Sequence, residues 1–285
     1  MGVGSIIKTL IRITKGEAFM NFRRIEWIFF VAFIILDVFL FSSILKQGPL
    51  NDSATNNHTE NTTVSVLKSM RDDQINVGKT SNENGMGYYV SSAQGNNLKD
   101  KGNQLHYQNW NYSDNKINST FATMIKLNTS NPTKTLNSIV DDSSQIIEGK
   151  DYRYCKELST KDTIVYAQYI KGKPVYGESG QIRFHVKNGY IQGYTQGHLD
   201  NIQVLRGSCK TLSQKRALIW LYQYNKLPTN STVEWSYLTY SDLLTVNGNV
   251  IYVPTWVFCI KNNVSGSIMY RRINAFTGAV MDANN

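Results

Sequence analysis

An uninterrupted apolar run near the N-terminus constrains this chain more than any other feature. Trp27 to Leu45 reads WIFFVAFIILDVFLFSSIL, 19 residues in which Asp37 carries the one charge. At about 1.5 Å per residue, a helix of this length is about 28 Å long, close to the thickness of the hydrocarbon core of a bilayer. The run therefore predicts a transmembrane helix, which we place at residues 26–45.

The charges on either side of the run predict its orientation. Residues 1–24 carry five Lys and Arg against one acid, whereas the other side begins with Lys46 alone. Because Lys and Arg stay on the cytoplasmic side, we expect residues 1–25 to be a cytoplasmic tail and the C-terminus to be extracytoplasmic, which makes this a single-pass protein of the cell membrane. A cleaved signal peptide is the alternative. Its apolar region is usually shorter, about 7–15 residues, and ends in a small-x-small site that is absent here.

Asp37 lies near the middle of the predicted membrane segment. A charge at that depth costs about 2.5–3.5 kcal/mol on insertion scales and is usually protonated or paired. Either the very apolar helix tolerates this acid, or the acid contacts another transmembrane helix. The candidate residues for such a transmembrane interaction are Trp27, Phe29, Phe33, Asp37 and Leu40.

Composition and pattern divide the rest of the chain. Residues 46–85 are rich in Asn, Ser, Thr, Asp and Gly and predict a flexible polar stalk. Residues 86–162 are weakly patterned and are expected to form a first extracytoplasmic subdomain, with a short strand at 88–90 and a short helix within 135–147. Residues 163–285 have a sharper pattern and are expected to form a C-terminal extracytoplasmic subdomain.

Two Asn-Gly pairs predict β-hairpins in the C-terminal subdomain. Asn188-Gly189 follows a stretch, 182–187, in which apolar and polar residues alternate, and Asn247-Gly248 lies between two strand-like segments. A type I′ turn needs positive φ at both central residues, which Asn and Gly tolerate best. Antiparallel strands are therefore expected on both sides of each turn.

A helix and further strands complete the predicted subdomain. Residues 211–227 predict a helix, with Thr211 and Gln214 as a capping box. The strand that contains Pro254 is expected at a sheet edge or at a bulge, because proline has no backbone N–H. With strands at 163–170 and 268–276, the order of elements predicts an α+β fold in which helices pack on antiparallel sheets.

No pattern in the sequence is typical of an enzyme. The P-loop, G-x-G-x-x-G, G-x-S-x-G and H-E-x-x-H motifs are all absent. The four histidines have no metal-ligand spacing, and His185 is expected to face solvent because it alternates with apolar strand residues. We therefore predict no catalytic residues, no metal and no cofactor.

The three cysteines are far apart in the sequence. Cys155, Cys209 and Cys259 lack the spacing of a metal knuckle, and their odd number argues against a disulfide framework. We expect all three to be small buried hydrophobic residues, with one disulfide and one free thiol as the alternative.

The chain is basic, with a net charge of +9. From Lys46 onward there are 25 Lys and Arg against 18 Asp and Glu. This excess is typical of a well-solvated surface, and it also favours attraction to anionic lipid headgroups or anionic wall polymers. Nucleic-acid binding is not predicted, because the basic residues are scattered and form no known binding module.

Several segments resemble the YycI (WalI) family, in that family's order. FRRIEWIFF at 22–30 resembles the family's opening. Four further segments look like the family's ectodomain: GKPV at 172–175, GYTQ at 193–196, YVPTW at 252–256 and INAFTG at 273–278. GYYV at 87–90 is a weaker match. The resemblance covers residues 20–285, and Met20 is the alternative start.

The resemblance implies a function that the residue patterns do not. YycI-like proteins are membrane-anchored, non-enzymatic regulators in low-GC Gram-positive bacteria. With the related YycH protein, they contact the sensor kinase of the WalK–WalR (YycG–YycF) two-component system, which controls cell-wall metabolism. The implied partners are a WalK/YycG-type histidine kinase, a YycH-like protein and the membrane.

The C-terminal unit, residues 211–282, also looks like a PepSY-type module. That resemblance leaves two alternatives open. The first is an extracytoplasmic module that binds a peptide or inhibits a protease. The second is a domain that binds cell-wall polymers.

Overall fold

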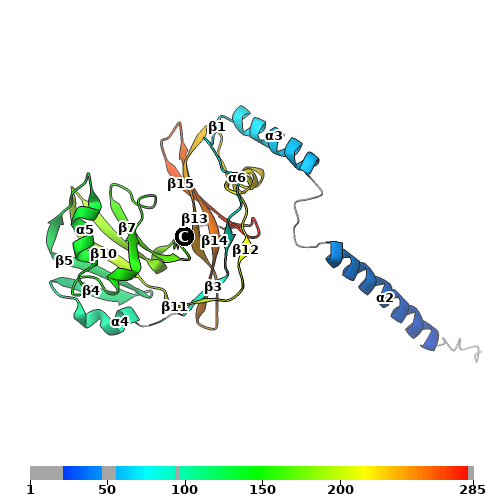
Figure 1. The fold of residues 1–285 in the computed structure, drawn as a ribbon, viewed down its shortest axis with the longest axis horizontal. Coiled ribbons are helices and arrows are strands. Elements are labelled where there is room, and N and C mark those ends of the chain that lie inside the picture. The colour runs from blue at the N-terminus through cyan, green and yellow to red at the C-terminus, as the bar shows by residue number, and fades with distance from the viewer. Residues whose placement is uncertain (1–21, 47–55, 94, 96, 282–285) are drawn as a thin grey trace, which may run out of the picture. The chain divides into compact units, whose positions relative to one another are not determined.

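The computed structural model describes residues 22–46, 56–93, 95 and 97–281 of a chain that divides into two units, Met1–Asn61 and Thr62–Asn285. The described part of the first unit is α2 (Phe22–Lys46) and the start of α3 (Asn56–Asp72) (Figure 1). Side chains of α2 are described at positions 26–40 and 42. Within the described residues, no helix is both long enough and apolar enough to span a membrane.

The second unit contains two large sheets, and we call the parts of the chain built on them the first and second lobes. The sheet of the first lobe is antiparallel. Its strands, in spatial order, are β4 (Gln108–Ser113), β5 (Lys116–Lys126), β10 (Tyr190–Gly197), β9 (Gln181–Lys187), β7 (Thr163–Ile170) and β6 (Tyr152–Tyr154), with β8 (Lys173–Pro174) paired to β7.

The sheet of the second lobe is built around one long hairpin. Its main path runs β1 (Ile75–Asn76), β13 (Ser231–Val246), β14 (Asn249–Asn262), β15 (Ile268–Asn274) and β16 (Val280–Met281). β3 (Val90–Ala93) pairs with β14 and with β11 (Asp200–Val204). β2 (Met86–Gly87) and β12 (Cys209–Lys210) form a separate small ladder.

Few helices accompany these sheets. The α-helices of the second unit, besides the end of α3, are α4 (Asn97–Lys101), α5 (Pro132–Val140) and α6 (Gln214–Gln223). Short 3₁₀ turns are η1 (Gly102–Gln104), η2 (Gly149–Asp151) and η3 (Glu178–Gly180). The predicted α+β class is confirmed, with sheet in excess of helix.

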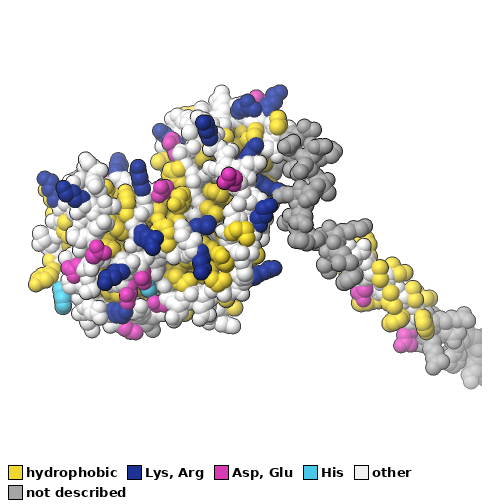
Figure 2. Space-filling view, in the orientation of Figure 1, with side chains coloured by type: hydrophobic (Ala, Val, Ile, Leu, Met, Phe, Trp, Pro, Cys, Tyr) yellow, Lys and Arg dark blue, Asp and Glu magenta, His cyan; other side chains and the backbone are white. Residues whose placement is uncertain are grey.

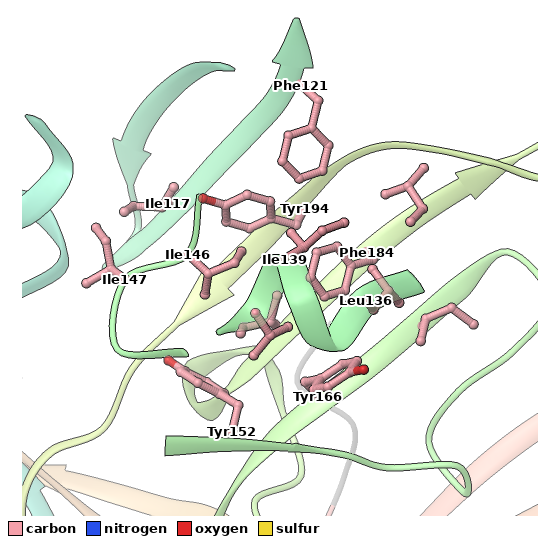
Figure 3. Packing of buried hydrophobic residues seen from close by; sticks show 14 of the residues in the cluster. Ile117, Phe121, Leu136, Ile139, Ile146, Ile147, Tyr152, Tyr166, Phe184 and Tyr194 are labelled. Atoms are coloured by element: carbon pink, nitrogen blue, oxygen red, sulfur yellow. The ribbon is translucent and has the colours of Figure 1, made fainter. Parts of the chain in front are cut away.

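The core of the first lobe lies between its sheet and α5 (Figure 3). Leu136 and Ile139 of α5 pack in the same cluster as Phe184 and Tyr194 of the sheet. The rings of Phe184 and Tyr194 are 5.8 Å apart, and Tyr166 meets Phe184 edge-on at 5.9 Å. The Tyr194 hydroxyl donates to the carbonyl of Gln145 at 2.7 Å, so burial of this ring leaves its polar atom satisfied.

Two smaller clusters complete the packing. In the second lobe, Leu218 and Leu221 of α6 pack with Phe258 and Ile273 of the sheet and with Met70 of α3. A third cluster joins the lobes, because Val175 and Leu199 pack there with second-lobe residues that include Tyr240 and Tyr252.

Local turn chemistry agrees with the sequence predictions. Asn188 and Gly189 have φ of 52° and 77°, and Asn247 and Gly248 have φ of 48° and 75°, so both predicted hairpins have positive φ at both turn residues. The strand predicted at 163–170 coincides with β7. His185 is exposed on β9, as predicted.

The predicted helix at 211–227 is too long, and its predicted cap is wrong. α6 begins after Ser213, whose side chain accepts from the N–H of Arg216. Thr211 and Gln214 are used elsewhere: the Thr211 hydroxyl accepts from Gly85, and the Gln214 carbonyl oxygen accepts from Ser81. These tertiary contacts replace the capping box.

The short helix predicted within 135–147 is present but begins earlier, at Pro132, and the location of Pro254 is corrected. α5 ends at Val140, and the Asp142 carboxylate then accepts from the N–H of Ser144, a local bond that competes with helix. Pro254 lies on β14, which is a central strand, and it pairs in register with Tyr240, so neither the predicted edge strand nor a bulge is found at Pro254. Its missing donor is tolerated because β14 exchanges partners there: pairing with β3 ends at Tyr252, and pairing with β15 begins at Thr255.

The structure differs from the predicted stalk and subdomain boundary. Residues 47–55 lie outside the described residues, but within 56–85 the chain forms α3 and β1, and Met70 and Ile75 are buried. A boundary at residue 163 would cut the first lobe, because β5 pairs with β10. Pairing between strands so distant in sequence has no local signal.

The cysteines are all free. Cys155 and Cys259 are buried as predicted, and burial raises the pKa of each thiol to about 11. Cys209 is only half-buried, because β12 is a short strand in an otherwise exposed segment.

Gly278 is predicted to be a stability determinant of the second lobe. Gly278 and Gly266 have the same φ of 71°, but a Cβ at Gly278 would overlap the Trp220 ring, whereas a Cβ at Gly266 meets nothing. Gly266→Ala should therefore cost about 1 kcal/mol, the cost of left-handed backbone. Gly278→Ala should cost about 2 kcal/mol more, because Trp220 must move. Urea unfolding of both variants measures this, and equal losses would contradict it.

Candidate functional site

The residues predicted to act in the membrane lie on α2. At about 100° per residue, Phe29, Phe33, Asp37 and Leu40 share one face of this helix. The exposed fractions of Phe29 and Phe33 are 70% and 63%, so these rings are accessible to another surface. Four of the five predicted residues thus form one continuous strip, which we call the Asp37 face.

Trp27 does not belong to the Asp37 face. It lies about 160° around the helix from Phe29, whereas the four residues of the strip fall within about 80° of one another. Its ring meets that of Phe30 edge-on, with centroids 6.1 Å apart. Its amphipathic indole is typical of the membrane–water boundary, which separates its predicted role from that of the strip.

A groove lies between the two lobes of the second unit. Its larger cavity has a volume of about 680 Å³ and is lined from the first lobe by Lys116, Glu178 and Arg183 and from the second by Asp242, Arg271 and Arg272. Figure 2 shows Lys and Arg side chains on both lobes of this face, interspersed with smaller groups of Asp and Glu. Among the described residues, the lining of the larger cavity also includes Lys226 and so contains five basic side chains and two carboxylates.

Glu178 holds two basic side chains in place on the first-lobe side of this cavity. Lys116 Nζ lies 2.5 Å from its Oε2, and Arg183 Nη1 lies 3.2 Å from its Oε1. The hydrogen bond from Lys116 is the main cause that lowers the pKa of this carboxyl. Glu178 follows Gly177, whose φ of 118° favours glycine, so the turn at η3 directs the carboxylate between the two cations.

Arg272 organises the second-lobe side. Its guanidinium lies over the Tyr176 ring, 5.8 Å from the centroid, and its Nη1 is 3.9 Å from Asp242 Oδ1. The Arg272 side chain is only 11% exposed. The distance to Asp242 exceeds hydrogen-bonding range, so this ion pair is loose. Next to it, Arg271 Nε donates to the carbonyl of Lys226 at 3.1 Å, which orients a second guanidinium.

A smaller cavity of about 280 Å³ adjoins the larger one. The two cavities share Lys116, Glu178, Ser179 and Asp242. The smaller cavity adds Asp114, His198 and Asp200, so its lining holds four carboxylates against one lysine and one histidine. The groove is therefore basic at one end and acidic at the other.

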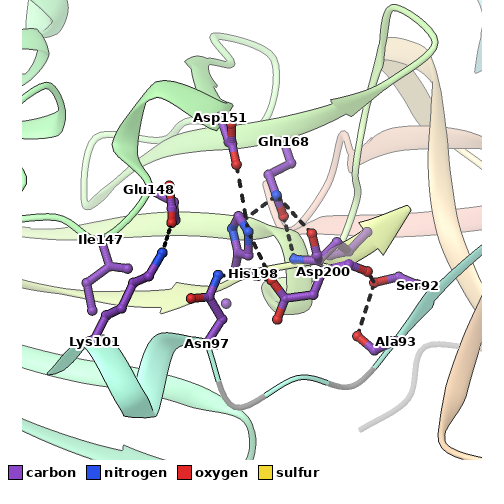
Figure 4. Close-up of polar contacts among 12 residues, drawn as sticks. Ser92, Ala93, Asn97, Lys101, Ile147, Glu148, Asp151, Gln168, His198 and Asp200 are labelled. Carbon is purple, nitrogen blue, oxygen red and sulfur yellow. Dashed lines mark hydrogen bonds and ion pairs between the residues drawn. The ribbon is translucent and has the colours of Figure 1, made fainter. Parts of the chain in front are cut away.

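His198 lies where the chain passes from β10 of the first lobe to β11 of the second (Figure 4). Its side chain is 6% exposed. Nδ1 is 3.1 Å from Gln168 Nε2 and 3.0 Å from the Tyr152 hydroxyl, and Nε2 is 3.4 Å from Asp200 Oδ1. Gln168 Oε1 accepts from the N–H of Leu199 at 2.7 Å, so the amide must present its NH₂ to His198.

This arrangement favours neutral His198 with its proton on Nε2. Nδ1 accepts from Gln168, and Nε2–H points towards Asp200 and Asp151. Burial lowers the pKa of the imidazole, although the carboxylates of Asp200 and Asp151 act to raise it. A proton on Nδ1 would face the Gln168 NH₂ group, a donor against a donor.

None of these contacts was predicted from the sequence. Arg183, Asp242 and Arg272 come from different strands, and their meeting depends on how the lobes are placed. The signal available at His198 was only a histidine two residues before an aspartate, which has no catalytic or metal spacing. Among the residues that the structure describes, no group of three or more His, Cys, Asp or Glu side chains has the geometry to hold a metal ion.

The His198 contacts predict that the second unit loses stability on acidification. The pKa of His198 is lower in the folded chain than its unfolded value of about 6.5, so the unfolded state binds the extra proton first as the pH falls. This contribution to stability is complete above about pH 7.5 and is lost progressively below about pH 6.5. Urea unfolding of wild type at several pH values should show the fall.

Two variants isolate the contribution of His198. His198→Gln should be less stable at about pH 7.5 by roughly 1–2 kcal/mol, because hydrogen bonds are lost, but its stability should change less between pH 7.5 and 5.5. His106→Gln, at an exposed histidine, should keep the wild-type dependence on pH. If the stability of His198→Gln depended on pH as steeply as that of wild type, His198 would not be the source of the pH dependence.

Comparisons with known proteins place the chain in a family. The chain matches the family model described as "YycI protein" over residues 53–276. No curated protein matches this chain.

Two solved structures are similar to the chain at low sequence identity. An uncharacterized protein from Eubacterium rectale is 11% identical, with a TM-score of 0.42, and the match covers 73% of this chain and 89% of that one. The YpeB C-terminal domain of Bacillus megaterium is 14% identical, with a TM-score of 0.33, and the match covers 78% and 95%. The family match spans most of the described second unit, including the charged residues of the groove and the His198 contacts, and on that match this chain belongs to the YycI family.

Proposed function

We propose that this chain is a membrane-anchored accessory regulator of a WalK/YycG-type sensor kinase, and that it acts with a YycH-like partner. The observation that carries the proposal is membership of the YycI family over residues 53–276. The chain is proposed to work by binding, through its transmembrane helix and its extracytoplasmic unit, and not by catalysis.

The anchor is proposed to be the helix α2. Its support is the apolar run from Trp27 to Leu45, 19 residues with one charge, and the basic residues that precede it. Such a run inserted in a bilayer has all its backbone hydrogen bonds satisfied within the helix. The second unit is then proposed to lie on the extracytoplasmic side, since the basic flank favours a cytoplasmic N-terminus.

The contact with the kinase is proposed to involve the Asp37 face. In hydrocarbon, Asp37 gains from a neighbouring helix that offers a hydroxyl or an amide, and such contacts contribute about 1–2 kcal/mol in model peptides. Phe29, Phe33 and Leu40 provide apolar surface on both sides of the acid. A regulator changes the activity of a kinase only by binding one conformational state of the kinase more tightly than the other. A contact of this size, made in one state alone, would shift the ratio of the two states about five- to thirtyfold.

Substitution of Asp37 tests the interface. Asp37→Leu makes the helix more apolar, so insertion should be unchanged or better, but co-purification of the kinase and the YycH-like partner should fall about tenfold. Asp37→Asn should have a smaller effect, because it keeps hydrogen-bonding capacity. Ile35→Leu, on the opposite side of α2, is the matched control and should retain wild-type association.

The outcome separates the interface from the regulatory role. Equal recovery of partners with all of these variants, at equal expression, would exclude the Asp37 face as the interface. Failure of the wild-type chain to recover the kinase from membranes would count against the regulatory proposal itself.

The anchor is also expected to remain uncleaved. The apolar run is longer than that of a signal peptide and lacks a small-x-small site after it. Mass measurement of the protein extracted from membranes should therefore find an N-terminus that precedes Trp27. A mature N-terminus beyond Leu45 would exclude an uncleaved anchor.

A further inference from the structure

We infer that the groove between the lobes binds a short peptide whose amino group and carboxylate are both free, with the amino group in the smaller, acidic cavity and the carboxylate in the larger, basic one. This inference goes beyond the proposed regulatory role and does not depend on it. It rests on the two adjoining cavities of the second unit and on the opposite charge of their linings.

The basic end is suited to a carboxylate. Arg183, Arg271 and Arg272 present three guanidinium groups to one cavity, and guanidinium binds carboxylate through paired hydrogen bonds. Arg183 is held by Glu178, and Arg272 by the Tyr176 ring, so both are oriented before a ligand arrives. Oriented side chains lose less entropy on binding.

The acidic end is suited to an ammonium group. Asp200 accepts from Asn97 Nδ2 at 3.1 Å through one oxygen, and its side chain is 15% exposed. A carboxylate offers about four acceptor positions, so Asp200 has capacity for a further donor. Asp114 and Asp242 line the same cavity and add negative charge around that position.

The residues where the two cavities meet favour a ligand with opposite charges at its two ends over a ligand that is negatively charged throughout. Asp242 lines both cavities, and its Oδ1 lies 3.9 Å from Arg272 Nη1, so unlike charges meet where the cavities join. A ligand with unlike charges at its two ends satisfies both linings. A polymer of phosphodiesters would place like charge against Asp114, Asp200 and Asp242, an arrangement that discriminates against it.

Volume is consistent with a short peptide. The larger cavity, at about 680 Å³, lies within the usual range for small-ligand sites, about 300–1,000 Å³. Its lining comes from both lobes, so a bound peptide would contact both and link them. Ligand binding at this place would stabilise one relative placement of the lobes.

Capped and uncapped peptides test the proposal on the wild-type full chain in detergent. The probes are oligoalanines of about two to six residues, whose reach grows by about 3.5 Å per residue. Calorimetry should find an optimal length that binds with both ends free. N-acetylation and C-amidation should each weaken the Kd of that peptide about tenfold, as expected for loss of one charge-assisted contact.

Substitutions in the two cavities then test which cavity binds each end of the peptide. Asp242→Asn should weaken binding of the free peptide and remove the effect of N-acetylation, whereas Arg183→Gln should remove the effect of C-amidation. Asp162→Asn and Lys187→Gln, at exposed residues outside both cavities, are the matched controls and should bind as wild type. Thermal melting of each variant checks that it folds.

Three results would overturn the inference. These are absence of binding at every length, capped peptides that bind as well as the free peptide, and binding of poly(glycerol phosphate) in place of the peptides. The first two are measured on the wild-type chain, so they hold even if a variant fails to fold. Recovery of the kinase by the chain is a separate measurement, so failure here leaves the regulatory proposal standing.

Discussion

The antiparallel pairing of β13 with β14 supports the rest of the second unit. Its register runs from Ser231 opposite Asn262 to Val246 opposite Asn249. Both outer edges of this hairpin are occupied: β1 and Val175 pair with β13, while β3 and β15 pair with β14. The bridge from Val175 to Tyr240 brings the first lobe to the hairpin. The lobes, the groove and the helix α6 are therefore all positioned by one pair of strands.

The parts of the fold that depend on neighbouring residues could be predicted from the sequence, and the parts that depend on distant ones could not. Asn247-Gly248 determines its turn because positive φ is a property of those two residues. The cap of α6 was mispredicted because Gln214 bonds to Ser81, a residue 133 positions away. The boundary placed at residue 163 failed for the same reason, since nothing near β5 indicates that it pairs with β10.

The candidate sites divide in the same way. The geometry of the Asp37 face could be predicted, because a helical period and an apolar run are local patterns, and its role as a contact stays a prediction. The groove could not, because its charged lining is assembled from β5, η3, β9, β13 and β15. The His198 contacts depend on both local and distant residues. The histidine is visible in the sequence, but its neutral form follows only from the orientation of Gln168.

The topology also sets an order for the appearance of strand partners during synthesis. The first-lobe strands, from β4 to β10, lie between β3 and β11 in the chain, and Ala93 of β3 pairs with Asp200 of β11. The first lobe is thus an insertion whose two ends meet. On a ribosome, β1 and β3 emerge before it, yet their hairpin partners β13 and β14 emerge only after it. All strands of the first lobe are therefore synthesised while β1 and β3 of the second lobe still lack their hairpin partners. The unpaired edges of β1 and β3 must avoid pairing with wrong strands until the chain is nearly complete.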